Sequence, residues 1–480
     1  MSKTRKSIYF SFFSKGIGIT LQIVSVAVIS RLLTPEEVGV FSIAVSLTTI
    51  LHALRSAGLT DYIVVDKNLS IEKVSTCFTV ICLISWFFSL LLWAGADAAG
   101  SFYGNDGITN VLLILAINFF LVPLSNITLA MLRRNLDFHL VAITGIIYSF
   151  VNTLSTIYLA YAGYSYMALA YGSLLATIVQ IIVLGIMMPR YIAFKPTIKE
   201  WKKIVSFSSF TTARTLVGHT SVYLNDLMIG RLIDIKSVAI FSRGVGLLNI
   251  FQLAITDTLW PIVQSWMAKD HRDNGTNQIK ENYLRLSRLF TGLAWPFYGV
   301  MFFLAEDITL LFFGPQWLES VPICKVMCIA MAIDSTHAFL QPTLTSLGHV
   351  KVGFYLASFD LLLKIIGISI GYNYGLEAIA YSLTITAVFS AFASYFLLKR
   401  ILSIPFFLQL SSLFKSAIIT ASSLIVAGAT VNVLSHSSLS NWITIVIAGS
   451  LSIIIWYLTA AALKHEVHTE ILESYRNTFK

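Results

Sequence analysis

The stretch that decides the fold is ISRLLTPEEVGVFSIAVSL, residues 29–47, because it returns 200 residues later as IGRLIDIKSVAIFSRGVGL, residues 229–247. Eight positions are identical in the two copies, and each copy lies where one apolar segment ends and the next begins. Weaker echoes are FYG at 102–104 against FFG at 312–314, and ALAY at 168–171 against AIAY at 378–381. Two similar membrane bundles in one chain are typical of transporters, whose substrate path runs between the halves.

The composition places the chain in a lipid bilayer. Hydrophobic residues make up 56% of the 480 residues, charged residues make up 12%, and the mean hydropathy is +0.78. Soluble domains carry about 25% charged residues. A span needs roughly 20 mostly apolar residues, and the sequence offers fourteen such segments. They are residues 9–32, 38–57, 77–98, 110–131, 140–161, 166–188, 204–229, 238–263, 289–305, 322–345, 353–371, 377–397, 414–432 and 442–463. Backbone amides in lipid must bond within their own segment, so these segments are predicted to be helices.

The basic residues predict the orientation of these spans. With the N-terminus inside, the cytoplasmic segments hold 23 of the 33 Lys and Arg residues, whereas the outer loops hold only Arg231 and Lys236. This asymmetry is typical of cytoplasmic loops and places both termini in the cytoplasm. The net charge of +9 then comes from the basic residues of the cytoplasmic segments, which face anionic membrane lipid. No nucleic-acid partner is required to explain this charge. No small-residue cleavage site follows the first apolar segment, which we therefore interpret as a retained span.

The repeat predicts the domain organisation of an all-α polytopic membrane protein. An even number of spans separates the two copies, so the six-helix halves point the same way and form a parallel repeat. We expect an N-terminal bundle at residues 1–188, a cytoplasmic linker at 189–203 and a C-terminal bundle at 204–397. Residues 398–480 would add two further helices and a cytoplasmic tail.

Several familiar chemistries have no signature in the sequence. There is no Walker glycine loop, so ATP hydrolysis by that route is excluded. The nine His are scattered without ligand spacing, and all four Cys fall inside predicted spans. The Cys are residues Cys77, Cys82, Cys324 and Cys328. We therefore expect no catalytic residue, no metal and no cofactor, and interpret the chain as a transporter rather than an enzyme.

A cation deep in the seventh predicted span is the leading candidate for substrate contact. Arg214 lies ten residues into that span, or ~15 Å from its start. Ser221 and Asn225 follow it at helical spacing and form one polar stripe. The 200-residue offset places Lys15 of the first span one position from Arg214, so each half offers a cation at similar depth. Guanidinium bonds two phosphate oxygens at once, which suits an anionic headgroup. The alternative is a buried ion pair with an acid on another helix.

Three acids also lie deep within predicted spans. Asp360 and Lys364 are four residues apart in the favourable order for a helical ion pair, which is the structural alternative to a lumen role for Lys364. Asp334, followed three residues later by His337, is either a proton site near the midplane or a capped polar patch in the bundle. Intramembrane acids are functional by default, so Asp334, Asp360 and Asp257 are candidates for ion coupling.

Other intramembrane cations have simpler interpretations. Arg55, Lys325 and Lys415 lie within about a turn of an expected helix end and could extend to the headgroups. Arg31 and its repeat partner Arg231 lie near the outer ends of their spans, where a side chain can bond the last carbonyls of a helix. Arg31 also remains a candidate lumen residue.

These residues carry a resemblance to a known family. The sequence LTPEEVGVF at 33–41 resembles the opening signature of bacterial polysaccharide and O-antigen flippases, members of the multidrug/oligosaccharidyl-lipid/polysaccharide exporter superfamily. The basic turn RRNLDF at 133–138, Asn225-Asp226 and FFGPQW at 312–317 are similar to the same family. The likeness covers about residues 8–463, although the family's usual Gly and Tyr are replaced by VAIF at 238–241.

The resemblance implies a flippase for an oligosaccharide repeat unit on undecaprenyl pyrophosphate. It would move the unit from the cytoplasmic to the outer leaflet of the bacterial cytoplasmic membrane for surface polysaccharide synthesis. Polymerases and glycosyltransferases would be the expected protein partners. Two alternatives stay open: an ion-coupled multidrug or cation antiporter of the same fold, and a membrane scaffold of a polysaccharide assembly complex. An antiporter for cations needs deep acids, whereas the first span carries Lys15 and no acid.

Overall fold

A computed structural model describes residues 3–56, 58–66, 68–188, 196–199, 201–274, 276–435 and 440–478. Within these ranges, side chains are not described at residues 3–13, 56, 61, 65, 202–212, 214, 274, 276–277 and 474–478. All regular structure in these ranges is helical, which confirms the predicted fold class. The chain divides into two compact units, Met1–Ala239 and Ile240–Lys480. The repeat-based domain boundaries place the division earlier in the chain and stay a prediction.

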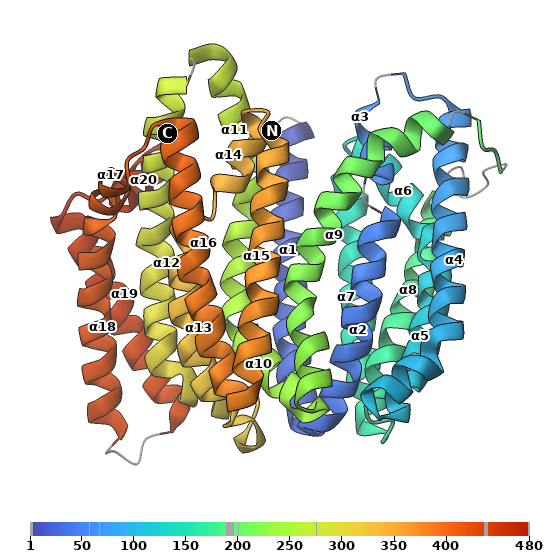
Figure 1. The fold of residues 1–480 in the computed structure, drawn as a ribbon, viewed down its shortest axis with the longest axis horizontal. Coiled ribbons are helices and arrows are strands. Elements are labelled where there is room, and N and C mark those ends of the chain that lie inside the picture. The colour runs from blue at the N-terminus through green and yellow to red at the C-terminus, as the bar shows by residue number, and fades with distance from the viewer. Residues whose placement is uncertain are drawn as a thin grey trace. The chain divides into compact units, whose positions relative to one another are not determined.

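The first unit contains nine helices among the described residues and the start of a tenth (Figure 1). They are α1 (Lys3–Leu32), α2 (Pro35–Ser56), α3 (Leu59–Val65), α4 (Ile71–Tyr103), α5 (Asp106–Leu121), α6 (Pro123–Arg134), α7 (Phe138–Tyr161), α8 (Met167–Met187), α9 (Trp201–Leu232) and the start of α10 (Ile235–Phe251). Within this unit α7 packs against both α1 and α8, α4 packs against α5, and α2 packs against α9.

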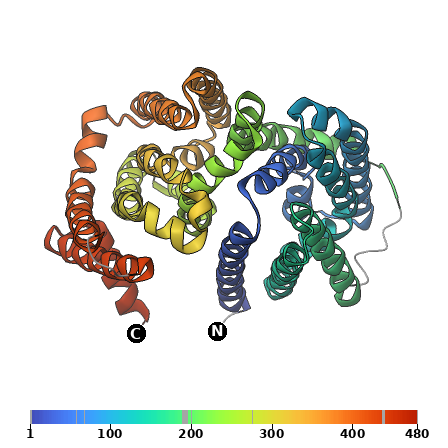
Figure 2. The same ribbon diagram turned by 90° about the horizontal axis from the view of Figure 1, so that it is seen from below.

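The second unit contains the rest of α10, and the helix pair α18–α19 lies near its C-terminal end. Its elements are the π-helical turn η2 (Gln252–Thr256), α11 (Asp257–Asn274), α12 (Thr276–Phe312), η3 (Pro315–Trp317), α13 (Ser320–Ser335), α14 (Leu340–Ser346), α15 (Val350–Gly371), η4 (Tyr372–Tyr374), α16 (Leu376–Leu402), α17 (Phe406–Ser412), α18 (Phe414–Ser435), α19 (Asn441–Ala462) and α20 (Glu466–Thr478). The α18–α19 pair packs on the long helix α12, as the views in Figures 1 and 2 both show.

Twelve described helices are long and apolar enough to cross a membrane, and the bent pair α5–α6 adds a thirteenth. Each coincides with one of the predicted spans. The remaining predicted span, residues 204–229, coincides with α9, several of whose side chains lie outside the described residues. The chain is therefore a multi-pass membrane protein.

Two predicted spans are less regular than the sequence indicated. The span expected at 110–131 bends by 45° between α5 and α6, where Pro123 cannot donate the next helical hydrogen bond. The polar residues 269–274, which follow the span predicted at 238–263, form the helical end of α11. The span expected at 322–345 breaks between α13 and α14, so the polar residues there lie beside interrupted backbone.

The repeated stretch folds the same way in both copies, with a helix N-cap at the same position. Thr34 and Glu37 form a capping box at the start of α2: the Thr34 amide donates to Glu37 Oε2 (2.7 Å), and the Glu37 amide donates to Thr34 Oγ1 (3.3 Å). At the start of α10, the Ser237 amide donates to Asp234 Oδ1 (2.6 Å). The repeat thus encodes a helix, a tight turn and a capped second helix.

The two copies also pack directly on each other within the first unit. A Cβ atom added at Gly39 would lie 2.0 Å from the carbonyl oxygen of Ile235, and one at Gly230 would lie 2.7 Å from Ile43 Cδ1. Ser46 Oγ donates to Asp226 Oδ2 (2.9 Å), which joins α2 to α9 by a polar contact. Glycine at these positions lets the helices approach closely, as small residues do between membrane helices. We call this contact the repeat junction.

Candidate functional site

The second unit contains a cluster of ionisable side chains within its membrane spans. Asp334 ends α13 near the middle of the broken span Ser320–Ser346, and its side chain is 54% exposed. His337 lies in the break, with its Nε2 4.0 Å from Asp334 Oδ1 and its side chain 12% exposed. The acid and the imidazole therefore lie close together, as their spacing in the sequence predicted.

A second acid completes this cluster from neighbouring helices. Asp360 on α15 accepts a hydrogen bond from Ser390 Oγ on α16 (2.7 Å). Lys364 lies one turn further along α15 and interacts electrostatically with both Asp360 and Asp334. The structure thus brings Asp334, His337, Asp360 and Lys364 together, and adds Ser390. A hydroxyl 30 residues away from its acid gives no signal in the sequence.

A mainly apolar cavity of about 320 Å³ adjoins the break between α13 and α14. Its lining combines Trp295 and Phe406 with Thr336 and Tyr395. The Tyr395 hydroxyl donates to Thr336 Oγ1 (2.8 Å), and the Trp295 indole N–H donates to the carbonyl of Ala332 (2.8 Å). The two bonds join α12 and α16 to the C-terminal end of α13 and the residue that follows it.

Asp257, the third predicted acid, lies in a different setting. It follows the π-helical turn η2, and Gln252 Nε2 donates to its Oδ1 (3.3 Å). Pro261 lies four residues further on, where its ring would clash with the Asp257 carbonyl in a regular helix. A π-turn at such a position is one way to absorb the misfit, and it leaves the Asp257 side chain exposed.

The predicted cationic site belongs to α1 and α9 of the first unit. The Arg214 side chain lies outside the described residues, although the α9 backbone places Arg214, Ser221 and Asn225 on one face, as predicted. Asn225 Oδ1 is buried and has no hydrogen-bond partner among the described residues. Lys15 on α1 and Arg31 at the end of that helix are both exposed. The grouping of these cations around one substrate stays a prediction.

Arg55 differs from its expected position. Its side chain is only 4% exposed, so it is buried in the bundle and does not extend to the headgroups. The guanidinium lies over the ring of Phe119, 4.9 Å from the centroid, while Nε and Nη1 have no hydrogen-bond partner among the described residues. A desolvated cation–π contact contributes about 2 kcal/mol. The position of Arg55 near a helix end did not predict that its charge would be buried, because burial depends on the contact with the Phe119 ring of α5.

The basic turn after α6 has a structural role. Arg134 Nη1 donates to the carbonyls of Ile63 and Asp66 (2.7 Å each), at the C-terminal end of α3. Lys73 donates to the Asp66 carboxylate (2.8 Å), and this bond lowers the pKa of Asp66 to about 2. Arg134 from α6 and Lys73 from α4 therefore hold the C-terminal end of α3.

No group of three or more His, Cys, Asp or Glu side chains that could hold a metal occurs among the described residues. The four cysteines are free thiols, and all four are buried.

Comparison with known proteins identifies the family of the chain. Residues 28–322, more than half of it, match the family described as polysaccharide biosynthesis protein. The chain belongs to this family. Relatives among the polysaccharide biosynthesis proteins include the teichuronic acid biosynthesis protein TuaB of Bacillus subtilis, 23% identical over 85% of this chain and 84% of TuaB. The lipopolysaccharide biosynthesis protein WzxC of Escherichia coli is 17% identical over 86% of each chain.

Solved structures show that this polysaccharide biosynthesis protein has a transporter fold. The lipid II flippase MurJ, in an inward closed conformation, superposes with a TM-score of 0.77 over 99% of each chain, at 15% identity. An inward-facing multidrug resistance MATE family transporter of the MOP superfamily superposes with a TM-score of 0.66, over 80% of this chain and 94% of that one, at 14% identity. The chain therefore has the fold that MurJ and this MATE transporter share.

Proposed function

We propose that the protein is a flippase that moves an undecaprenyl-pyrophosphate-linked oligosaccharide from the cytoplasmic to the outer leaflet of the bacterial cytoplasmic membrane. The observation that carries this proposal is membership of a polysaccharide biosynthesis family combined with a transporter fold. A chain without enzymatic motifs then contributes to the pathway by moving an intermediate. Polymerases and glycosyltransferases would act on either side of this step.

The proposed substrate is negatively charged, so the cations of the first unit would bind its pyrophosphate. A pyrophosphate cannot cross hydrocarbon without charge compensation, and Arg214 with Lys15 would provide it. Asn225 and Ser221 would bind polar groups along the same face, and Arg31 would lie near the outer exit. Movement of the two halves would expose the site to each leaflet in turn.

The repeat junction would lie at the outer end of the first unit. With the N-terminus in the cytoplasm, the turns at Thr34 and Asp234 lie at the outer surface. The glycine contacts and the Ser46–Asp226 bond then join α2 to α9 and α10 at that end. Release of the substrate outward would require this junction to separate.

Depletion of the protein tests the proposed step. We expect lipid-linked repeat units to accumulate in the cytoplasmic leaflet while surface polymer falls by at least tenfold. The intermediates would be measured by lipid extraction, and their leaflet by access of an added glycosidase in intact spheroplasts. Normal polymer with increased retention of cationic dyes would support a multidrug antiporter and refute the flippase.

The Asp334–Asp360 cluster suggests ion coupling, and Asp360→Asn tests it. The amide keeps the shape and the hydrogen bond from Ser390 but cannot ionise. We expect export to fall by at least tenfold and to lose its dependence on the membrane ion gradient, measured in inverted vesicles. Ser390→Ala is the matched control, because it removes the hydrogen bond and leaves the carboxyl group. Normal export with unchanged gradient dependence in Asp360→Asn would refute ion coupling through this carboxyl group.

A further inference from the structure

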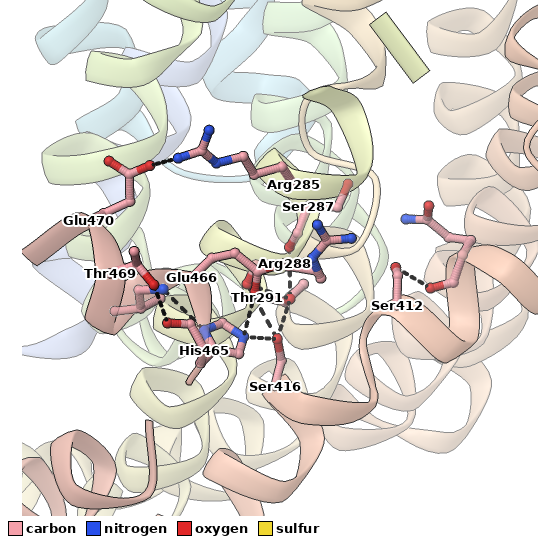
Figure 3. Close-up of polar contacts among 12 residues, drawn as sticks. Arg285, Ser287, Arg288, Thr291, Ser412, Ser416, His465, Glu466, Thr469 and Glu470 are labelled. Atoms are coloured by element: carbon pink, nitrogen blue, oxygen red, sulfur yellow. Dashed lines mark hydrogen bonds and ion pairs between the residues drawn. The ribbon is translucent and has the colours of Figure 1, made fainter. Parts of the chain in front are cut away.

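The C-terminal helix α20 is fixed to the rest of the second unit by a compact set of polar contacts (Figure 3). Arg288 on α12 donates to Glu466, and Arg285, about one turn earlier, donates to Glu470. The two cations thus match two acids at helical spacing on α20. Both pairs are partly exposed, so they position the helix more than they stabilise it.

His465 lies at the centre of these contacts and is fully buried. Gly292 on α12 provides the space for its ring, because a Cβ there would lie 2.6 Å from His465 Cε1. The Ser416 hydroxyl on α18 lies 3.1 Å from His465 Nε2, and the Trp456 indole on α19 donates to the Gly292 carbonyl (2.8 Å). One imidazole therefore contacts α12 and α18 at the point where α19 also bonds α12.

The hydrogen bonds of His465 require its neutral form. The Val467 amide donates to His465 Nδ1 (3.2 Å), so His465 is the N-cap of α20. Since Nδ1 accepts, the ring proton lies on Nε2 and is donated to Ser416 Oγ. Protonation of Nδ1 would place two donors against each other and remove the cap. A histidine N-cap is thus available only while the ring is uncharged.

We propose that α20 is a strap that holds the α18–α19 pair on α12 while His465 is neutral, and that acid releases it. The proposal does not depend on what the protein transports.

Burial and the charged groups around the His465 ring determine whether acid strengthens or weakens the closed strap. Burial lowers the pKa of His465; Glu466 opposes this shift, while Lys415 and Arg288 add to it. A pKa below the usual value of about 6.5 means that the closed strap favours the neutral ring. The stabilisation of the closed strap is therefore fully present above about pH 6.5. It is lost as the pH falls from there through the lower pKa of His465 in the folded protein.

Hydrogen exchange of the full-length protein in nanodiscs tests the strap. Amide protection in peptides covering α20 would be measured by mass spectrometry at pH 7.5 and pH 5.0, corrected for intrinsic exchange rates. We expect protection in the wild type to fall at least tenfold at the lower pH. In His465→Asn the side-chain oxygen still caps the helix and cannot be protonated, so protection should be equal at both pH values.

His468→Asn is the matched control. This second histidine of α20 lies against the ring of Tyr457 (5.4 Å between centroids), so its loss should leave the acid response intact. Should His465→Asn fail to fold, Ser416→Ala should already show reduced protection at pH 7.5. An unchanged wild type at pH 5.0, or the same acid response in His465→Asn, would overturn the proposal.

Discussion

Replacing Arg214 with alanine should abolish polymer export while the protein still inserts into the membrane. A guanidinium that bonds pyrophosphate contributes about 1.5–3 kcal/mol per charged hydrogen bond. Loss of one such bond alone predicts a tenfold to hundredfold decrease in transport. Surface polymer would be measured in a deletion strain complemented by the variant, with membrane levels followed by immunoblot.

Two further variants make the Arg214 test specific. Arg214→Lys keeps the charge but loses the two-pronged geometry, so it should retain partial export. Arg133→Ala removes an exposed cation at the end of α6 and should export normally. Wild-type polymer in Arg214→Ala would mean that the pyrophosphate does not use this residue.

Replacing Gly39 with alanine should strongly destabilise the protein, although only one carbon atom is added. The new Cβ would lie 2.0 Å from the Ile235 carbonyl oxygen, which is a backbone atom and cannot rotate away. Overpacking of this kind costs up to about 3 kcal/mol, and each kcal/mol lowers the melting temperature by about 2–4 °C in a unit of this size. Thermal unfolding of the purified protein would measure the effect.

Gly145→Ala in α7 is the control for this substitution. A Cβ at Gly145 meets no atom within 4 Å, and alanine is the better helix former by about 1 kcal/mol. We therefore expect an unchanged or slightly higher melting temperature. Equal melting of Gly39→Ala and the wild type would show that α2 and α10 are not held together at this point.

The sequence predicted the fold well because lipid imposes simple rules. Apolar segments of sufficient length must be helical, and every predicted span coincides with a described helix or bent pair. The interruptions were harder to foresee. Pro123 gave a visible warning of the bend after α5, whereas the break after Ser335 contains no proline and depends on bonds from distant Tyr395 and Gln409.

The candidate sites were predictable only in part, for a similar reason. Asp334 with His337, and Asp360 with Lys364, are neighbours along one helix or its break, so their spacing indicated the pairs. The contribution of Ser390 and the burial of Arg55 against Phe119 depend on which helices pack together. Spacing along one helix does not contain that information.

The repeat junction has a consequence for the origin of the chain. Its contacts join a residue of one copy to a different residue of the other, as Gly39 meets Ile235 and Gly230 meets Ile43. In a dimer of two identical half-length chains related by a two-fold axis, each such contact would occur twice, once in each direction. Duplication and fusion of an ancestral gene would then have converted a symmetric dimer contact into an internal one. Each copy was afterwards free to diverge, so that Gly39 now corresponds to Ala239.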